Sequence, residues 1–518
     1  PALISRRVGS GQLIVSTVNG RAWNAPEAVE ALAALGARTF PARRPKPLVL
    51  PADRAEPFIA QQVGYEIADR GTIAAILVPF VGLFIIAGLW LAYRRRLEQL
   101  GLVGAVLAVA TTLVLVAVGR ARIGELQPTR AALQLVNVGG GGEAAEISGV
   151  FGLFDPAGDS SGDQTQITSD NGGWAWPKPT GEQIDLVRMV WYDLDRWEWK
   201  QVRLPAGAVR PVSFALTSPF ARRLTMDLSI ESQGLMGQIE WPQAMQPSEV
   251  LLASPHGQMR VEVVKPTDPT VIAARPSDVL PNGVFLGSGV VGPQSQARSQ
   301  VVAALLNERQ WLTGPTLLAW SRGLETHFHF ADRFGEEEEA LWVVPIELSP
   351  AEPGAKVLVP WPLVRMEPMK PKLAREVFGV SAMPLYRPDV HQWIEGVTAA
   401  SAFAAAFHPP EAVMPLKTTG GRLHVDITAI GRPVRVLGLS ADGEVVEAAT
   451  AQGPDGQQVF DLPAEALTVR PDGSILIAID VGQAPLQIAS ETSSSAMWSI
   501  RQFGLEVTGE VLDTPTPA

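Results

Sequence analysis

Two long apolar stretches dominate the hydrophobic pattern of this chain. Residues 72–93 and 101–119 contain no charged side chain, and each is close to the roughly 20 residues that a helix needs to cross the hydrocarbon core of a bilayer. The alternative is a pair of helices buried in a large soluble core, but such helices normally keep one polar face. The pattern therefore predicts a transmembrane helical hairpin over 71–119.

The link between the two stretches predicts the orientation of this hairpin. Arg94, Arg95 and Arg96 lie in the link, with Glu98 as the acidic residue beside them. Short loops rich in Lys and Arg stay on the cytoplasmic side of a membrane. Two arginines beyond the second stretch weaken this bias without reversing it. We therefore expect the arginine turn in the cytoplasm and both large flanks on the extracytoplasmic side.

After the second stretch the hydrophobic pattern changes to a period of two. Short alternating or β-branched runs are bounded by Gly, Pro, Asp or Asn, which is typical of strands joined by turns. We expect a β-sandwich-like domain over 120–270, a mixed α/β segment over 271–400, and a jelly-roll-like β-sandwich over 401–518. The predicted strands are 132–138, 146–154, 186–192, 197–204, 224–230, 315–320, 341–348, 422–427, 434–439, 458–462, 474–481 and 498–507, with one helix at 295–307.

The first seventy residues have the pattern expected at the end of an α/β domain. Residues 11–18 form a β-branched run suited to a buried strand, and Asn24 followed by Pro26 forms a helix start before 27–35. One strand and one helix cannot make a domain. We therefore expect 1–70 to be the C-terminal part of a Rossmann-like extracytoplasmic domain, with further strands encoded upstream.

Composition is that of an ordinary globular protein and argues against one class of partner. The chain is 46% hydrophobic and 18% charged, with a net charge of −11. Nucleic-acid binding needs a clustered basic surface, whereas the basic residues here are scattered among a larger number of acidic ones. We expect no nucleic-acid partner. The absence of cysteine is compatible with an oxidising compartment.

The chain contains no recognisable catalytic signature. It has no Gly-x-Ser-x-Gly, no His-Glu-x-x-His and no cysteine nucleophile. The 53 acidic residues offer many carboxylate pairs, so a hydrolase that uses two carboxylates stays open. We expect a protein that is not an enzyme and that holds no cofactor or metal.

Tryptophan is concentrated in one short region of the chain. Trp174, Trp176, Trp191, Trp197 and Trp199 lie within it, and the first two and the last two each share a face at strand period. Such residues pack across strands in a core, or form an exposed aromatic surface for a protein or a sugar ring. Packing is the simpler interpretation. We take these five residues as the candidate interface if they are exposed.

His327 and His329 could share one strand face, where two imidazoles can ligate a metal together with Glu325 or Asp332. No third ligand has convincing spacing, so an ordinary strand is the preferred interpretation.

Three polar or glycine-rich segments have simple explanations. Asp155, Asp159 and Asp163 match no calcium loop and suit a hairpin tip. The acidic run 336–339 is read as a solvated turn, or else as a docking surface for a basic partner. The run 139–142 lacks the Lys-Ser/Thr of a phosphate loop.

The order of these parts resembles an uncharacterised family of large bacterial inner-membrane proteins. The similar phrases are 8–15, 148–156, 233–237 and 296–300. The resemblance implies a glutamine-amidotransferase-like α/β domain that ends near the N-terminus, a two-helix transmembrane hairpin and a β-rich extracytoplasmic region. It also implies a partnership with export or envelope machinery. None of the similar phrases is a catalytic signature.

Two functions of different class follow. The first is a non-enzymatic membrane-anchored scaffold, or accessory subunit, whose extracytoplasmic β domains dock on a larger envelope or membrane complex. Its partners would be the lipid bilayer and other proteins, and it would lie in the bacterial inner membrane with most of the chain on the periplasmic side. The alternative is an extracytoplasmic carbohydrate-binding protein or hydrolase.

Overall fold

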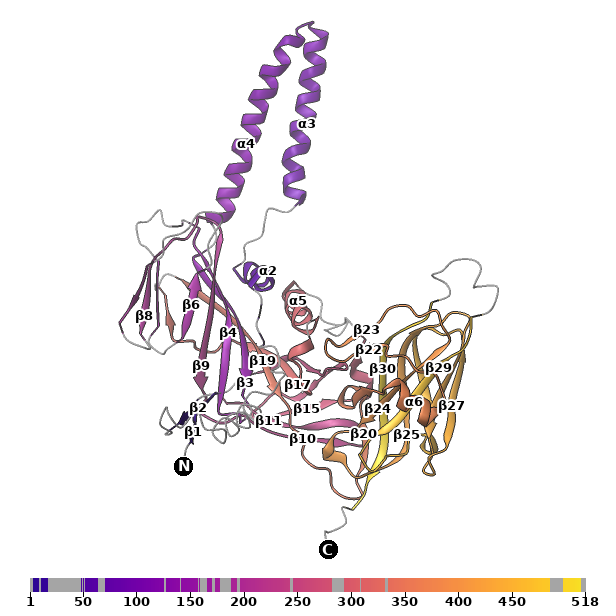
Figure 1. The fold of residues 1–518 in the computed structure, drawn as a ribbon. Coiled ribbons are helices and arrows are strands. Elements are labelled where there is room, and N and C mark those ends of the chain that lie inside the picture. The colour runs from indigo at the N-terminus through magenta and orange to yellow at the C-terminus, as the bar shows by residue number, and fades with distance from the viewer. Residues whose placement is uncertain are drawn as a thin grey trace, which may run out of the picture.

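The computed structural model describes a chain made mainly of β-strands, with 47% strand and 23% helix. Figure 1 shows a long helix pair that projects from a large body of sheets, and a second body of sheets at the C-terminal end. The structure describes residues 3–8, 11–16, 48, 50, 52–63, 70–124, 127–139, 141–156, 158, 165–169, 173–177, 188–192, 196–242, 246–281, 293–307, 309–330, 334–484 and 497–513.

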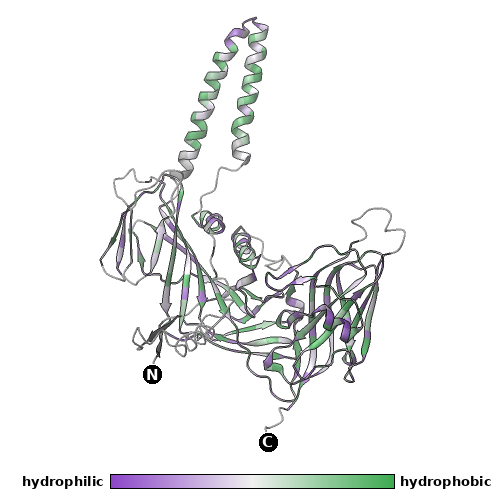
Figure 2. Ribbon diagram, in the orientation of Figure 1, coloured by the Kyte–Doolittle hydropathy of each residue, from purple (hydrophilic) through white to green (hydrophobic). Residues whose placement is uncertain are grey.

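The two apolar stretches form helices α3 (Arg70–Tyr93) and α4 (Leu100–Gly124). They are joined by a short turn that contains η2 (Leu97–Gln99) and run side by side. Within them, Ala74–Tyr93 and Leu100–Gly119 are long and apolar enough to cross a membrane, and only 6% and 0% of the two segments is buried. Hydrophobic residues lie along most of both helices in Figure 2, and hydrophilic residues lie at the turn that joins them. The predicted pair of long apolar helices is therefore confirmed, and most of its side chains have no protein around them.

A nine-stranded sheet forms the centre of the first body. Its only parallel pair joins β19 to β3, and the other neighbours are antiparallel. Strands that precede residue 270 and strands that follow it belong to this one sheet. The domain boundary predicted at residue 270 therefore falls within a single sheet. In spatial order the strands are β16 (Val279–Leu280), β13 (Gln258–Arg260), β12 (Ser248–Ala253), β17 (Thr316–Arg322), β19 (Gly335–Pro345), β3 (Thr129–Val138), β4 (Ala144–Phe154), β9 (Val209–Pro219) and β6 (Trp174–Pro177).

Both faces of the nine-stranded sheet are covered. Helices α2 (Ala52–Gln62) and α5 (Pro293–Asn307) cover one face, where Phe58 stacks on Trp320 at 5.6 Å between ring centroids. The helix predicted at 295–307 is thus confirmed. The other face packs on two four-stranded sheets. Their strands are β10 (Thr225–Glu231), β11 (Gly234–Glu240), β15 (Thr270–Ala274) and β14 (Glu262–Lys265), then β18 (Phe328–His329), β5 (Thr165–Ser169), β8 (Trp197–Val202) and β7 (Arg188–Trp191).

Two further sheets form the second body around one shared core. Phe403 and Phe407 of one sheet contact Phe503 of the other, with ring centroids 5.3 and 5.4 Å apart. Helix α6 (Pro371–Phe378) packs on an outer face. One sheet has β20 (Lys356–Val359), β30 (Ser499–Val511), β25 (Leu416–Thr428) and β28 (Asp455–Pro463). The other has β21 (Arg365–Pro368), β24 (Ser401–His408), β29 (Ile475–Val481), β26 (Pro433–Leu439) and β27 (Val445–Gln452).

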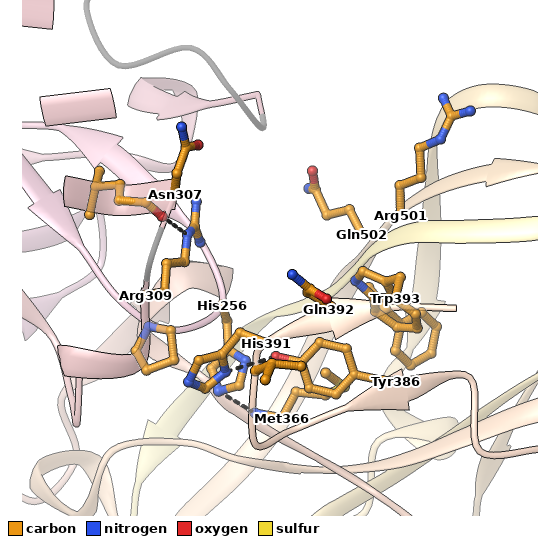
Figure 3. Close-up of a pocket in the computed structure, with 14 residues that line it drawn as sticks. His256, Asn307, Arg309, Met366, Tyr386, His391, Gln392, Trp393, Arg501 and Gln502 are labelled. Carbon is orange, nitrogen blue, oxygen red and sulfur yellow. Dashed lines mark hydrogen bonds between the residues drawn. The ribbon is translucent and has the colours of Figure 1, made fainter. Parts of the chain in front are cut away.

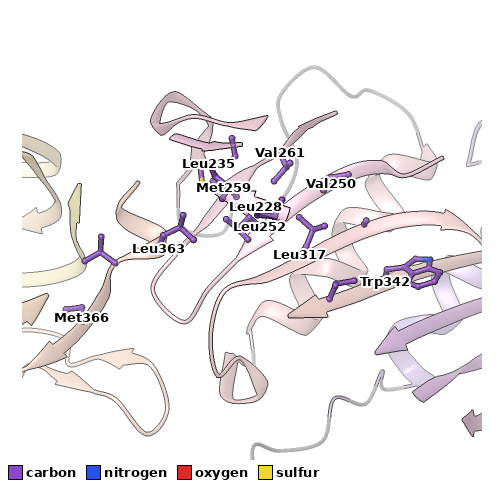
Figure 4. Close-up of a cluster of buried hydrophobic side chains, with 14 of the residues drawn as sticks. Leu228, Leu235, Val250, Leu252, Met259, Val261, Leu317, Trp342, Leu363 and Met366 are labelled. Carbon is purple, nitrogen blue, oxygen red and sulfur yellow. The ribbon is translucent and has the colours of Figure 1, made fainter. Parts of the chain in front are cut away.

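A continuous apolar core joins the two bodies. Figure 4 shows Leu228 and Leu252 of the first body in the same cluster as Leu363 and Met366, which lead into the second. The Leu228 carbonyl also accepts a 2.7 Å hydrogen bond from the Ser349 N–H. Further 3₁₀ helices in the described part of the chain are η4 (Pro276–Asp278), η5 (Arg309–Trp311), η6 (Trp361–Leu363), η7 (Glu411–Val413) and η8 (Ala464–Ala466).

The N-terminal strand predicted at 11–18 is β2 (Gly11–Ser16), which pairs with β1 (Leu3–Val8). The pairing is antiparallel, whereas a Rossmann-like layer pairs its strands in parallel. The helix predicted at 27–35, with Asn24 and Pro26 at its start, lies outside the described residues. The end of an α/β domain at 1–70 therefore stays a prediction. The described strand pair does not have the parallel orientation expected for such a domain.

Candidate functional site

Three of the predicted tryptophans form an exposed aromatic surface on the first body. Trp174 and Trp176 lie on β6, and Trp191 lies on β7 of the neighbouring sheet. Their exposed fractions are 43%, 49% and 45%. The rings of Trp174 and Trp176 are nearly parallel at 8° and 5.9 Å apart, and Trp191 meets Trp174 edge-on at 4.9 Å. We call these three residues the tryptophan surface.

The other two tryptophans of the predicted interface hold this surface in place from behind. The Trp197 and Trp199 indole N–H groups each donate a 2.6 Å hydrogen bond, to the carbonyls of Gly173 and Ala175 respectively. Trp197 is only 1% exposed and Trp199 is half-buried. Trp197 is therefore a core residue and not an interface residue, because strand β8 turns that side chain toward the nine-stranded sheet.

A polar cluster lies on the face of β7 and β8 opposite to Trp191, because Glu198 pairs with Val190 whereas Trp191 pairs with Trp197. The Tyr192 hydroxyl donates a 2.6 Å hydrogen bond to Glu198, and the Lys200 ammonium lies 3.1 Å from the same carboxylate. Burial raises the pKa of Glu198, but the hydrogen bonds from Tyr192 and Lys200 outweigh it and leave the pKa below its ordinary value. Arg196 lies over the Tyr192 ring at 5.6 Å.

The acidic run 336–339 is part of strand β19 and not a solvated turn. Glu338 pairs with Arg130 at 2.5 Å, and burial raises the pKa of Glu338 above its ordinary value although Arg130 opposes the shift. Glu339 is 8% exposed. The parallel pairing with β3 fixes this strand, so two of the four carboxylates point inward.

Glu339 belongs to a buried ionic network that joins both covering helices to the sheet. Arg298 of α5 pairs with Glu339 at 2.8 Å and with Glu249 of β12 at 3.0 Å, and Gln62 of α2 donates a 2.9 Å hydrogen bond to Glu339. Burial lowers the pKa of Arg298, but the two carboxylates outweigh it and raise the pKa. The network borders a cavity of about 1080 Å³ that carries both signs of charge.

The other polar candidates are not brought together into a site. His329 lies in β18, but His327 precedes the strand with a left-handed backbone (φ 54°), so the two do not share one strand face. The described part of the chain holds no group of three or more potential metal ligands. Asp155 is buried, whereas Asp159 and Asp163 lie outside the described residues.

A small pocket lies where the two bodies meet (Figure 3). It has a volume of about 240 Å³. Arg309 and Asn307 come from the first body, and Gln392, Trp393 and Gln502 from the second. Strands β22 (Tyr386–Arg387) and β23 (Gln392–Trp393) carry part of its wall. No local motif indicated this pocket, because its residues come from segments far apart in the chain.

His256 connects the two bodies at the base of this pocket. Its Nε2 accepts a 3.1 Å hydrogen bond from the Met366 N–H, so the neutral imidazole carries its proton on Nδ1. Burial, and then the positive charges of His391, Arg309 and Arg365, lower the pKa of His256 to about 3. Tyr386 and His391 contact each other at 3.0 Å, and burial raises the pKa of Tyr386 to about 12. Among the described residues that line the pocket, Arg309 and Arg501 carry a positive charge and none is acidic.

No protein-family model and no curated protein matches the chain. Among solved structures, the mu-homology domain of yeast delta-COP-I bound to a Dsl1 peptide is 12% identical, with a TM-score of 0.21 over 42% of this chain and 95% of that domain. A two-domain protein of unknown function from Bacteroides fragilis is 8% identical, with a TM-score of 0.16 over 75% and 97%. A family 43 arabinoxylan arabinofuranohydrolase from Bacillus subtilis is 11% identical, with a TM-score of 0.14 over 74% and 66%. These scores are too low to support an argument.

Proposed function

We propose that this protein is a non-enzymatic, membrane-anchored scaffold or accessory subunit that docks on a larger envelope or membrane complex. The observation that carries the proposal is the combination, in one chain, of an uncovered apolar helix pair with a β-rich body that exposes the tryptophan surface. The helix pair supplies the anchor in the bacterial inner membrane. The two β bodies, which we take to be sandwiches and jelly-roll-like at the C-terminus, lie on the periplasmic side.

The tryptophan surface is the part of the molecule best suited to a protein partner. Tryptophan is over-represented among the residues that carry most of the energy of protein interfaces. Trp174 and Trp176 are held from behind by the Trp197 and Trp199 hydrogen bonds to β6, so their strand is fixed before binding. A prearranged surface loses less conformational entropy when a partner binds.

Replacing Trp174, Trp176 and Trp191 together with alanine is expected to remove the partner without releasing the protein from the membrane. The loss should amount to at least about 2 kcal/mol of binding free energy. Co-purification from native membranes measures it. The control replaces Val264 and Val459, which are each 56% exposed, with alanine. Equal recovery of partners with both variants would contradict a docking role for this surface.

The proposed orientation is tested by site-directed labelling. The native chain has no cysteine, so single cysteines can be introduced without a background. We expect a membrane-impermeant maleimide added from the periplasmic side to label Asp442→Cys, in the turn between β26 and β27. The same reagent should leave Gln99→Cys, beside the arginine turn, unlabelled until the membrane is opened. Labelling of Gln99→Cys but not of Asp442→Cys from the periplasmic side would indicate the opposite topology.

The near-parallel rings of Trp174 and Trp176 favour carbohydrate as the second candidate ligand. Exposed indole rings can stack on the flat faces of sugar rings, and these two are nearly parallel at 8°. A glycan array separates this function from the first. Saturable binding that is lost in the three-alanine variant would favour the carbohydrate function, and an empty array would leave protein docking as the function of the surface.

A further inference from the structure

Arg309 is a half-buried cation whose hydrogen-bond acceptors are all neutral. Its Nε donates to the Leu306 carbonyl at 3.3 Å, one Nη donates to the Ser254 carbonyl at 3.5 Å, and the other donates to Gln258 Oε1 at 2.5 Å. Among the described residues no carboxylate forms an ion pair with it. Burial lowers the pKa of Arg309 below its ordinary value. A guanidinium has five N–H groups, so two remain beyond these three hydrogen bonds.

None of the described residues that line the pocket beside Arg309 is acidic, although the chain carries a net charge of −11. A neighbouring cavity of about 820 Å³ lies beyond His256, Tyr386 and His391, and its wall includes glutamates and Asp472. His256, Tyr386 and His391 line both cavities. Acidic residues are found among the described residues of the larger cavity but not among those of the smaller one. The arginine side is suited to a negative ligand, because a desolvated charge without a counter-charge is costly.

The remaining walls of the pocket indicate the size and polarity of that ligand. Asn307, Gln392 and Gln502 present amide groups, which both donate and accept hydrogen bonds. Figure 3 shows Asn307 on the Arg309 side of the pocket and the two glutamines on the opposite side, with Trp393 beside them. A volume of about 240 Å³ is below that of a typical drug-sized site. The ligand is therefore small, and it carries hydroxyl groups that can form hydrogen bonds with these amides.

We propose that the pocket between the two bodies binds a small hydroxylated carboxylate, of the size of a single sugar acid, with its carboxylate on Arg309. Arginine presents paired N–H groups that match a carboxylate. Because residues from both bodies line the pocket, the bound molecule would also contact both sides of the junction. This site is separate from the tryptophan surface, and neither proposal depends on the other.

The test is calorimetric titration of the full chain in detergent with D-glucuronate, D-glucose and inorganic phosphate. We expect saturable binding of D-glucuronate to one site and no saturable binding of D-glucose. Arg309→Met should weaken D-glucuronate binding at least about tenfold, because it removes a charge-assisted hydrogen bond. The matched control is Arg435→Met, which removes an exposed arginine that pairs with Asp480 at 2.5 Å and does not line the pocket, and it should bind D-glucuronate as the wild type does.

A second variant, Asn307→Ala, distinguishes lost binding from lost folding. It leaves the three internal hydrogen bonds of Arg309 in place. We expect this variant to unfold at the wild-type temperature and to bind D-glucuronate several-fold more weakly. Three results would overturn the proposal. They are no binding of D-glucuronate to the wild type, equal losses in Arg309→Met and Arg435→Met, or tighter binding of phosphate than of D-glucuronate, which would assign the pocket to phosphate compounds.

Discussion

Four arginine substitutions in the middle of the helix pair are expected to release the protein from the membrane. Each central arginine opposes insertion by roughly 2.5–3.5 kcal/mol, so two in each helix exceed what the apolar side chains provide. The substituted side chains are exposed and contact little else, so both β bodies should keep their fold. The positions are Ile85 and Leu89 in α3, and Val109 and Leu113 in α4, with exposed fractions of 54%, 67%, 61% and 63%.

Alkaline extraction of membranes measures this release. The control carries alanine at the same four positions, which shortens the side chains without adding charge, and it should stay in the membrane pellet. Retention of the four-arginine variant in the pellet would contradict a membrane role for the helix pair. It would indicate instead that α3 and α4 pack on another protein.

Replacing Arg298 with methionine is expected to destabilise the first body by about 3–5 kcal/mol. The change leaves the carboxylates of Glu339 and Glu249 without their cation, while their side chains are only 10% and 13% exposed. It also removes the guanidinium that lies over the Trp320 ring at 5.3 Å. The free energy of unfolding in denaturant measures the loss.

The control for Arg298 is an exposed ion pair. Arg435 pairs with Asp480 at 2.5 Å, but the arginine side chain is 51% exposed. Replacing Arg435 with methionine should therefore cost no more than about 1 kcal/mol. Similar losses in the two variants would show that the Arg298 network does not hold α2 and α5 on the sheet.

The helix pair and many strands could be predicted from the sequence because each depends on a local pattern. Uniform hydrophobicity identified α3 and α4, and a period of two identified β3 and β4. Strand β24 was missed because its buried run, Ser401–His408, does not alternate. The run 336–339 was misassigned because only the parallel pairing of β19 with β3, two distant segments, buries half of its carboxylates.

The candidate sites were also predictable only where they depend on a local sequence pattern. Strand period correctly placed Trp197 and Trp199 on one face of β8, because both indoles reach toward β6. The same period cannot show which face of a strand is buried, so it did not separate core Trp197 from exposed Trp174. The pocket at Arg309 could not be predicted, since its walls come together only when the two bodies pack.

Membrane anchoring with docking is tested most directly by gentle detergent extraction from native membranes, followed by mass spectrometry of every protein that co-migrates with the chain. Docking predicts a defined set of partners at fixed stoichiometry that is lost when the three residues of the tryptophan surface become alanine. Migration of the chain alone in the detergent extract would contradict docking, and its recovery without detergent would contradict anchoring.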